Sequence, residues 1–480
     1  MVVARNVLFI TADQWRGECL SCLGHFVQTP NLDALAAHGV LFTNHFANTA
    51  PCGPSRASIH TGVYQHEHGV TFNHVPLSAR YTNWALEARR AGHDPVLFGY
   101  TDTTLDEGQQ DSYPDGVLPG LAPLVQLGKD IWEPLEWVDW LVAKGYPAPD
   151  TPADLYRKTR PRSDTDERND IAPALEVPAE LHDTYFMVEN VLDYIRDRSG
   201  WCVHLSLLRP HPPWTAPEPY NRMYPPGDLP FPNRAADPDN EAKQHPFLAY
   251  ALNRKYQRLS RDDASRRQWQ SSYYGLMTEV DHNLGRLFDE LKRSGAWNDT
   301  LVVFTSDHGE QIGDHWLIGK FGYFDESFHV PMIVFNPAPE ARQHRGQRIN
   351  AFTEGVDITP TLLDWLGVEI PEQCRGASLL PATTSGNLGD HWRTEAHWEF
   401  DFSYFQAGDA LRVSTGESRL AVVRDENSKY VHFPALPDVF FDLADDPGES
   451  FNLASDPRYR SRVEEASRKL QSWFGHRATA

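Results

Sequence analysis

The sequence has little cysteine, no long apolar run and a shortage of positive charge. Five cysteines among 480 residues are too few, and odd in number, for a disulfide framework. No stretch approaches the roughly 20 consecutive apolar residues that a membrane-spanning helix requires. The formal net charge of -22 would repel nucleic acids and anionic membrane surfaces. We therefore expect neither nucleic acid nor membrane as a partner, whereas a small anionic substrate is compatible if positive charge gathers in a cleft.

The N-terminal segment also lacks the features of a secretory leader. Its apolar run, "NVLFI", is short, ends before Asp13 and precedes no small-residue cleavage site. We therefore interpret it as a strand and expect a cytoplasmic protein. The C-x-x-C pair of Cys19 and Cys22 is weak evidence for zinc, because no second pair accompanies it.

The chain is long enough for a large domain and a smaller one, since single cores stop growing at about 250–300 residues. Hydrophobic residues make up 40% and charged residues 23%, which is typical of globular proteins. Near-continuous apolar runs, which are typical of strands buried on both faces, occur at residues 6–10, 94–100, 201–208, 298–310 and 330–336.

Helical patterns separate these runs, most clearly at residues 278–295. Strands that alternate with helices predict an α/β fold with a mostly parallel central sheet sandwiched by helices. From about residue 380 short strand-like pieces such as "SRLAVVRD" and "KYVHF" replace this alternation. We therefore predict a catalytic α/β domain at residues 1–380 and a smaller C-terminal α+β subdomain at residues 381–480.

Three potential metal ligands follow two of the predicted strands. Asp13 comes just after the first strand, and Asp307 and His308 come just after "LVVFTS". An acidic residue after a strand often only caps the next helix. Two carboxylates and an imidazole at one sheet edge instead indicate a bound cation, because like charges repel without one. A mixed oxygen and nitrogen shell suits Mn²⁺, Fe²⁺ or Zn²⁺ better than Ca²⁺.

Cys52 stands at the start of a predicted short helix, "PSRASIHTG", that ends at Gly62. The N–H groups at that helix end favour an anion, and Arg56 adds donors suited to a tetrahedral oxyanion. A stabilised thiolate and a small buried cysteine are equally compatible with this pattern.

The segment "CGPSRASIHTG" resembles the sulfatase signature, in which the cysteine is oxidised to formylglycine after synthesis. The resemblance covers most of the chain, through "VLFITADQWR", "QTPNLDALAAHGVLFTNHFA", "TSDHGE", "GVDITPTLLDWLGV" and "VFFDLADDPGESFNLA". It implies that Cys52 is an aldehyde precursor, whose hydrate attacks sulfur or phosphorus and later expels the bound group by re-forming the aldehyde.

The resemblance also implies roles for individual residues. One divalent metal, Mn²⁺ before Fe²⁺, Zn²⁺ or Ca²⁺, would be bound by Asp13, modified Cys52, Asp307 and His308. Arg56 would hold the aldehyde hydrate and the metal shell in place. A maturation enzyme that generates formylglycine is then an implied partner.

Several residues depart from the arylsulfatase pattern. Gln14 stands in place of a second aspartate, His308 in place of an asparagine, and "GYTD", residues 99–102, in place of G-K-W-H. These changes resemble the phosphonate monoester hydrolase and phosphodiesterase branch, as does "IGKFGYFDESFHVP", which contains Lys320. Threonine is more usual in that branch where this chain has Asp102, an extra carboxylate that could repel an anion.

Five further assignments rest on the same resemblance. His211 in "RPHPPW" would protonate the leaving alkoxide, and Lys320 would provide charge for the leaving group or a non-bridging oxygen. Asn73 and Tyr100, together with Gln14, would contact the substrate.

The sequence thus predicts a metal-dependent formylglycine hydrolase of phosphonate monoesters and phosphodiesters, with side activity on sulfate esters. One alternative is a sulfate-ester hydrolase in the narrow sense. The other is a non-catalytic metal-binding relative in which Cys52 stays a thiol. Relatives in this branch often assemble, so we also expect a homo-oligomer, a dimer or a tetramer.

Overall fold

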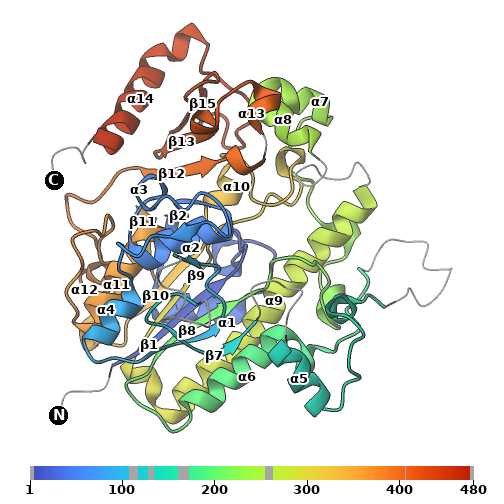
Figure 1. The fold of residues 1–480 in the computed structure, drawn as a ribbon, viewed down its shortest axis with the longest axis vertical. Helices are drawn as coiled ribbons and strands as arrows, with labels where there is room; N and C mark the ends of the chain where they lie inside the picture. Colours follow the sequence, from blue (N-terminus) through green and yellow to red (C-terminus); the bar gives the residue numbers. More distant parts are fainter. Residues whose placement is uncertain are drawn as a thin grey trace.

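The computed structural model describes residues 5–106, 117–127, 135–159, 172–254, 263–405 and 407–475. Its main element is an eight-stranded sheet in the order β11-β2-β10-β9-β1-β8-β5-β7 (Figure 1). The strands are β1 (Asn6–Ala12), β2 (Val40–Phe46), β5 (Pro95–Gly99), β7 (Ala122–Gln126), β8 (Cys202–Leu207), β9 (Thr300–Thr305), β10 (Met332–Phe335) and β11 (Gln347–Glu354).

The sheet is mostly parallel, as predicted. β1 pairs in parallel with β8 and β9, and β5 pairs in parallel with β8 and β7. Of the described strands in this sheet, only β10 runs antiparallel to its neighbours, which are β9 and β2. Each of the five predicted apolar runs overlaps a strand of this sheet.

Helices cover both faces of the sheet because successive strand residues point to opposite sides. In β1, Leu8 and Ile10 pack into one core and Val7 and Phe9 into the other. The first core also receives α1 (Pro30–His38), α5 (Leu135–Ala143), α6 (Asp183–Ile195) and α9 (Asp263–Ser294). The second receives α2 (Cys52–Thr61), α4 (Trp84–Arg90), α11 (Ile358–Leu366) and α12 (Leu380–Ser385). The predicted α/β sandwich is therefore confirmed.

A second, antiparallel sheet lies near the C-terminus, in the order β15-β14-β13-β12-β3. Its strands are β12 (Ala396–Asp401), β13 (Arg419–Arg424), β14 (Ser428–His432), β15 (Val439–Asp442) and the parallel edge strand β3 (Thr49–Ala50). Helix α14 (Arg460–Gly475) packs on it through Ala466 and Leu470. Because β3 directly precedes Cys52, the C-terminal sheet supports the segment that carries this residue. The division at residue 380 stays a prediction.

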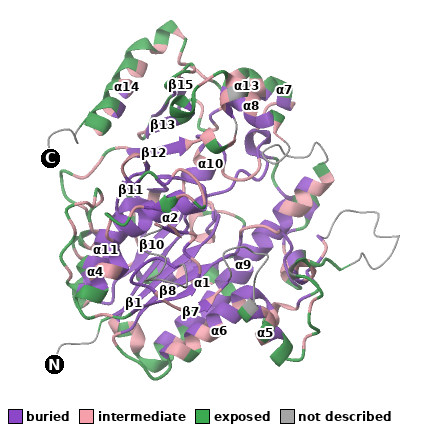
Figure 2. Cartoon of the chain, in the orientation of Figure 1, coloured by how far each residue is buried: buried purple, intermediate pink, exposed green. Residues whose placement is uncertain are grey.

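The remaining elements are short. They are α3 (Gln65–His68), α7 (Pro238–Glu241), α8 (Pro246–Asn253), α10 (Asp325–Phe328), α13 (Ala407–Leu411) and the paired strands β4 (Pro76–Leu77) and β6 (Thr104–Leu105). Burial is concentrated in the central sheet and α2, whereas the outer face of α14 is exposed (Figure 2). None of the helices in the described ranges is long and apolar enough to cross a membrane.

Glu354 joins the two sheets at the end of β11. Its carboxylate accepts hydrogen bonds from the His397 backbone N–H at 2.8 Å, from Asn48 Nδ2 at 3.1 Å and from the Tyr64 hydroxyl. Burial raises the pKa of this carboxyl, but the charge of Arg393 and these hydrogen bonds outweigh burial and lower it to about 2. The negative charge is therefore part of the folded structure.

We predict that Glu354→Gln lowers the free energy of unfolding at pH 7 by about 2–4 kcal/mol, because the amide NH₂ would face hydrogen-bond donors. In the wild-type protein, the contribution of this depressed pKa is present above about pH 4.3, the usual pKa of glutamate, and is lost as the pH falls toward 2. Denaturant titrations at pH 7 and pH 3 measure both effects. Glu464→Gln, at an exposed position, is the control. Equal stability of Glu354→Gln and the wild type at pH 7 would contradict this role.

Candidate active site

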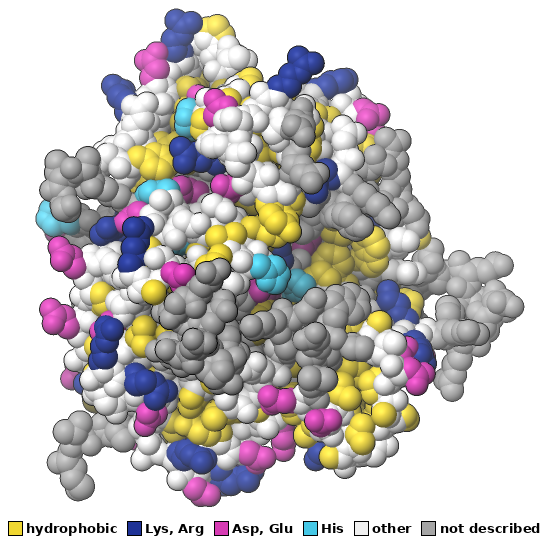
Figure 3. Space-filling model, viewed as in Figure 1, with side chains coloured by type: hydrophobic (Ala, Val, Ile, Leu, Met, Phe, Trp, Pro, Cys, Tyr) yellow, Lys and Arg dark blue, Asp and Glu magenta, His cyan; other side chains and the backbone are white. Residues whose placement is uncertain are grey.

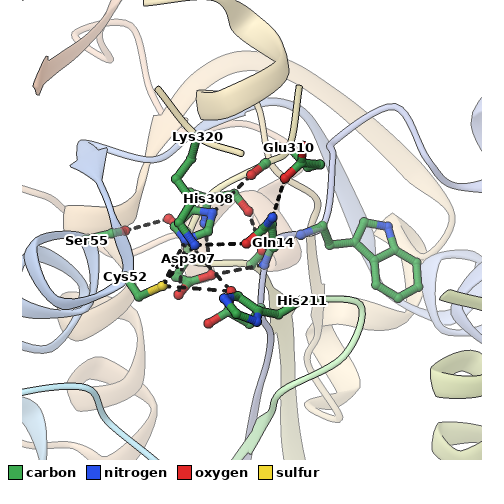
Figure 4. A network of polar contacts seen from close by, with 12 residues as sticks. Gln14, Cys52, Ser55, His211, Asp307, His308, Glu310 and Lys320 are labelled. Atoms are coloured by element: carbon green, nitrogen blue, oxygen red, sulfur yellow. Dashed lines mark hydrogen bonds and ion pairs between the residues drawn. The ribbon is translucent and has the colours of Figure 1, made fainter. Parts of the chain in front are cut away.

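Four buried side chains converge at the carboxyl ends of neighbouring parallel strands. Asp13 follows β1, Asp307 and His308 follow β9, and Cys52 is the first residue of α2. One ligand atom from each lies within 4.8 Å of the others. His308 Nε2 is 3.2 Å from Cys52 Sγ and 3.8 Å from Asp13 Oδ1. The structure thus brings together all four residues that were predicted to bind a metal. Figure 4 shows three of them, Cys52, Asp307 and His308.

The donor set fits a divalent cation. Two carboxylates, an imidazole and the Cys52 side chain offer mixed ligands, and a cation would offset the repulsion between the carboxylates. His308 Nδ1 lies 3.0 Å from the Gly309 carbonyl oxygen, so that Nδ1 carries the proton and Nε2 is free to act as a ligand. No second group of this kind occurs in the described ranges, and Cys19 and Cys22 form none.

Arg56 holds the two carboxylates in place. Its Nε donates to Asp307 Oδ2 at 2.9 Å, and its Nη2 donates to Asp13 Oδ2 at 3.1 Å. Its Nη1 donates to Ser206 Oγ at 2.7 Å and to the Tyr100 carbonyl oxygen at 3.1 Å. The guanidinium is therefore directed at the carboxylates of Asp13 and Asp307 and not at an open anion site.

The start of α2 differs in one respect from the expectation. The Gly53 N–H, which was expected to favour an anion, donates to Asn73 Oδ1 at 2.8 Å. Ser55 Oγ donates to the Asp307 carbonyl oxygen at 2.5 Å, which ties the helix to the end of β9. The N–H group that was expected to bind an anion therefore already donates to a neighbouring side chain.

Lys320 is a second cation close to Cys52. Its Nζ lies 3.4 Å from Cys52 Sγ and donates to Gln14 Oε1 at 2.9 Å. Burial lowers the pKa of Lys320, but the neighbouring Cys52, Asp13 and Asp307 outweigh burial and raise it above its ordinary value. Burial and the adjacent Asp13 charge raise the pKa of the Cys52 thiol. The site therefore holds a charged ammonium beside a neutral thiol.

Glu310 fixes the position of Gln14 and of the loop that carries Lys320. It accepts a hydrogen bond from Gln14 Nε2, which turns Gln14 Oε1 toward Lys320. Glu310 Oε1 also accepts the backbone N–H groups of Ile312 and Gly319, each at 2.7 Å. Glu310 was not among the predicted site residues, although it ends the "TSDHGE" segment.

His211 lies beside this cluster (Figure 4). Its Nδ1 is 2.7 Å from the Pro212 carbonyl oxygen, so Nδ1 donates and Nε2 is an acceptor in the free protein. Removal of the ring from bulk water, together with the charge of Lys320, lowers the pKa of His211 to about 3. The ring is therefore neutral near pH 7 until a negative charge is placed next to it.

An ion pair behind His211 fixes its loop. Arg209 Nη2 and Nε donate to Asp183 Oδ2 at 2.6 and 3.0 Å, and both side chains are buried. Arg209 Nη1 donates to the His211 carbonyl oxygen at 2.9 Å. No local sequence pattern indicates this pair, because Asp183 stands 26 residues earlier, on α6.

The predicted substrate contacts Tyr100 and Asn73 form the walls of the site. The Tyr100 hydroxyl donates to Asp13 Oδ2 at 2.5 Å, and its ring lies 4.3 Å from the Arg56 guanidinium carbon. Gly99 precedes it with φ +116°, where a Cβ would collide with the Ser206 carbonyl oxygen, so the strand end needs glycine. The roles of Tyr100 and Asn73 toward a substrate stay predictions.

Comparisons with known proteins show which family the chain belongs to. A sulfatase family model matches residues 5–368, and a model of the N-sulphoglucosamine sulphohydrolase C-terminal region matches residues 313–474. The chain is 40% identical to the multifunctional alkaline phosphatase superfamily protein PehA of Trinickia caryophylli, over 98% of this chain and 95% of that protein. It is 28% identical to an arylsulfatase of Clostridium perfringens, over 96% and 92%.

Two solved structures share the fold closely. The phosphonate monoester hydrolase of Agrobacterium radiobacter superposes with a TM-score of 0.89 at 40% identity, covering 98% of this chain and 96% of that chain. The phosphonate monoester hydrolase of Silicibacter pomeroyi gives a TM-score of 0.89 at 34% identity, covering 98% and 94%. The chain therefore belongs to the sulfatase family of the alkaline phosphatase superfamily.

Proposed function

We propose that the protein hydrolyses phosphonate monoesters and phosphodiesters, with side activity on sulfate esters. The observation that carries this proposal is the charge around Cys52. Arg56 is engaged by Asp13 and Asp307, which leaves Lys320 as the cation that faces the sulfur atom. One ammonium suits a reacting group with a single negative charge, which these substrates share. The 40% identity to a phosphonate monoester hydrolase supports the same choice.

A divalent metal and formylglycine complete the proposed site. Asp13, Asp307, His308 and modified Cys52 would hold the metal, in our proposal Mn²⁺, with Fe²⁺, Zn²⁺ or Ca²⁺ as alternatives. Such an ion, when bound, activates a nucleophile and polarises the ester. Formylglycine made from Cys52 supplies the nucleophilic hydroxyl in place of the thiol.

The remaining side chains orient the ester and move its proton. Lys320 attracts the non-bridging oxygens or the leaving-group oxygen, and Gln14, Asn73 and Tyr100 line the space where the reacting group binds. The bound anion raises the pKa of His211, whose Nε2 then holds the proton that the leaving alkoxide needs. The protein around Cys52 excludes bulk water, which strengthens each of these interactions.

Two rivals remain from the sequence analysis. A sulfate-ester hydrolase in the narrow sense is favoured by the 28% identity to an arylsulfatase but disfavoured by Gln14 and His308. A non-catalytic relative would keep Cys52 as a thiol. We also propose that the protein acts in the cytoplasm, that a maturation enzyme converts Cys52 there, and that the chain forms a dimer or tetramer.

We predict that kcat/KM for an aryl phosphonate monoester and an aryl phosphodiester exceeds that for an aryl sulfate. Cys52→Ala should lower kcat/KM at least about 10³-fold for each substrate, because the substitution removes the nucleophile. Peptide mass spectrometry should show the Cys52 peptide about 18 Da lighter than the thiol form. A dominant sulfate activity would favour the first rival. An unmodified, inactive protein after co-expression with a maturation enzyme would favour the second.

We predict that the purified protein binds one divalent metal per chain, and that chelation abolishes hydrolysis until Mn²⁺ is restored. His308→Asn replaces the nitrogen ligand by oxygen, so Mn²⁺ affinity should fall at least about tenfold and the preference should shift toward Ca²⁺. Elemental analysis and metal titration measure both. His38→Asn, at an exposed position, is the matched control. Unchanged Mn²⁺ affinity in His308→Asn would show that His308 is not a ligand.

We predict that Asp183→Asn lowers kcat/KM for alkyl esters on the order of tenfold more than for p-nitrophenyl esters. The reason is that poor leaving groups need the proton of His211. The plot of log kcat/KM against leaving-group pKa should steepen, as it should further in His211→Ala. Asp193→Asn, an exposed position on the same helix, should leave the plot unchanged. An equal loss for all leaving groups would mean that the Arg209–Asp183 pair is only structural.

A further inference from the structure

Asp102 places a carboxylate at the active site that has no partner there. The residue follows β5 with φ +50°, a left-handed conformation that a non-glycine residue seldom adopts. Its side chain makes no hydrogen bond or ion pair with any residue in the described part of the chain. Its burial is incomplete, so a ligand can reach it.

Two observations place Asp102 beside Cys52: its backbone carbonyl borders Gly53, and its carboxyl is acted on by the charges around Cys52. A Cβ at Gly53 would lie 3.0 Å from the Asp102 carbonyl oxygen and 3.1 Å from Asn73 Oδ1, so Asp102 and Asn73 border the same residue. Burial raises the pKa of the Asp102 carboxyl. The charges of Arg56 and Lys320 lower this pKa, and the charge of Asp13 raises it. The carboxylate thus lies within the field of the cluster that would receive an anionic ester.

Exposed aromatic rings lie on the same side of the site. Phe72, which precedes Asn73, stacks on Tyr404 with ring centroids 3.8 Å apart and planes 14° from parallel. Phe405 meets Phe72 edge-on at 5.2 Å and contacts Phe321, the neighbour of Lys320, at 4.9 Å. Tyr404 is 64% exposed. These rings therefore form a continuous chain of contacts from Phe72, next to Asn73, to Phe321, next to Lys320.

Hydrophobic side chains and histidines gather near the middle of the face shown in Figure 3. A half-buried phenylalanine stacked on an exposed tyrosine beside a catalytic centre is suited to the organic part of a substrate, since it offers stacking and cation–π contacts. An unpaired carboxylate in the same place repels an anion unless the ligand brings a positive charge. The two features together describe a site for a cation attached to an anionic ester.

We propose that Asp102 selects esters whose organic group carries an ammonium, with the Phe72–Tyr404 pair covering the carbon atoms around that charge. The reacting group remains a monoanion, so the preferred substrate is a zwitterion. This inference rests on the proposed hydrolysis of phosphodiesters and phosphonate monoesters, and it names the class of substrate for that site.

The test compares two p-nitrophenyl phosphodiesters that differ only in charge. One carries a 2-(trimethylammonio)ethyl group, and the other carries the neutral isostere 3,3-dimethylbutyl. We expect wild-type kcat/KM to be at least about tenfold higher for the cationic ester, and Asp102→Asn to reduce this ratio to near one. In this variant the neutral ester should react faster, because the repulsion of its phosphate is removed.

Further variants separate charge from structure. Asp102→Thr should behave like Asp102→Asn, whereas Asp94→Asn, a surface aspartate, should retain the wild-type ratio. Tyr404→Ala should lower the ratio, and Tyr404→Phe, which keeps the ring, should restore it. The proposal is overturned if the wild-type protein has equal kcat/KM for the two esters. It is also overturned if Asp102→Asn lowers kcat/KM for both esters by the same factor.

A binding measurement keeps the two proposals distinguishable. Calorimetry on Cys52→Ala gives the dissociation constants of the matching cationic and neutral phosphonate monoesters without turnover. Tighter binding of the cationic ester, abolished by adding Asp102→Asn, supports the role of Asp102 even if no ester is hydrolysed. Absence of hydrolysis would overturn the proposed function, whereas equal binding of the two ligands would overturn the selection by Asp102.

Discussion

The active site depends on one buried interaction, the bridge that Arg56 forms between Asp13 and Asp307. The two carboxylates come from the ends of adjacent strands and would repel each other in a site from which water is excluded. One guanidinium binds Oδ2 of each carboxylate, and Asp13 Oδ1 is left 3.8 Å from His308 Nε2 and 4.0 Å from Cys52 Sγ. Because Arg56 lies one turn into α2, the bridge also fixes where that helix begins, and thereby where Cys52 stands.

The position of α2 explains why the C-terminal sheet matters to the chemistry. Every residue of α2 is buried, so the helix depends on contacts on all sides. Strand β3 precedes it and pairs with β12, and Glu354 links β11 to the backbone of His397. The smaller sheet therefore supports the first residue of α2 directly.

The sequence was sufficient to predict the central strands, because buried parallel strands are almost continuously apolar, and their ends located Asp13, Asp307 and His308. It did not reveal β2 and β11, whose polar residues break the apolar pattern, or the short edge strand β7. Glu310 and Asp183 were missed for a different reason. Their functions depend on Gln14 and Arg209, which stand 296 and 26 residues away, and no local pattern records such pairs.

The charges of the site indicate how one family scaffold can favour monoanionic groups. Asp13 and Asp307 are the two carboxylates of the buried cluster with Cys52 and His308, and Arg56 already offsets part of their charge. A divalent ion bound there, as proposed, would together with Lys320 give a modest positive excess, which suits one negative charge better than two. Asp102 reduces that excess further on one side of Cys52. A substrate gains most from such a site when its own charges are arranged in the complementary order, with the anion at the metal and a cation at Asp102.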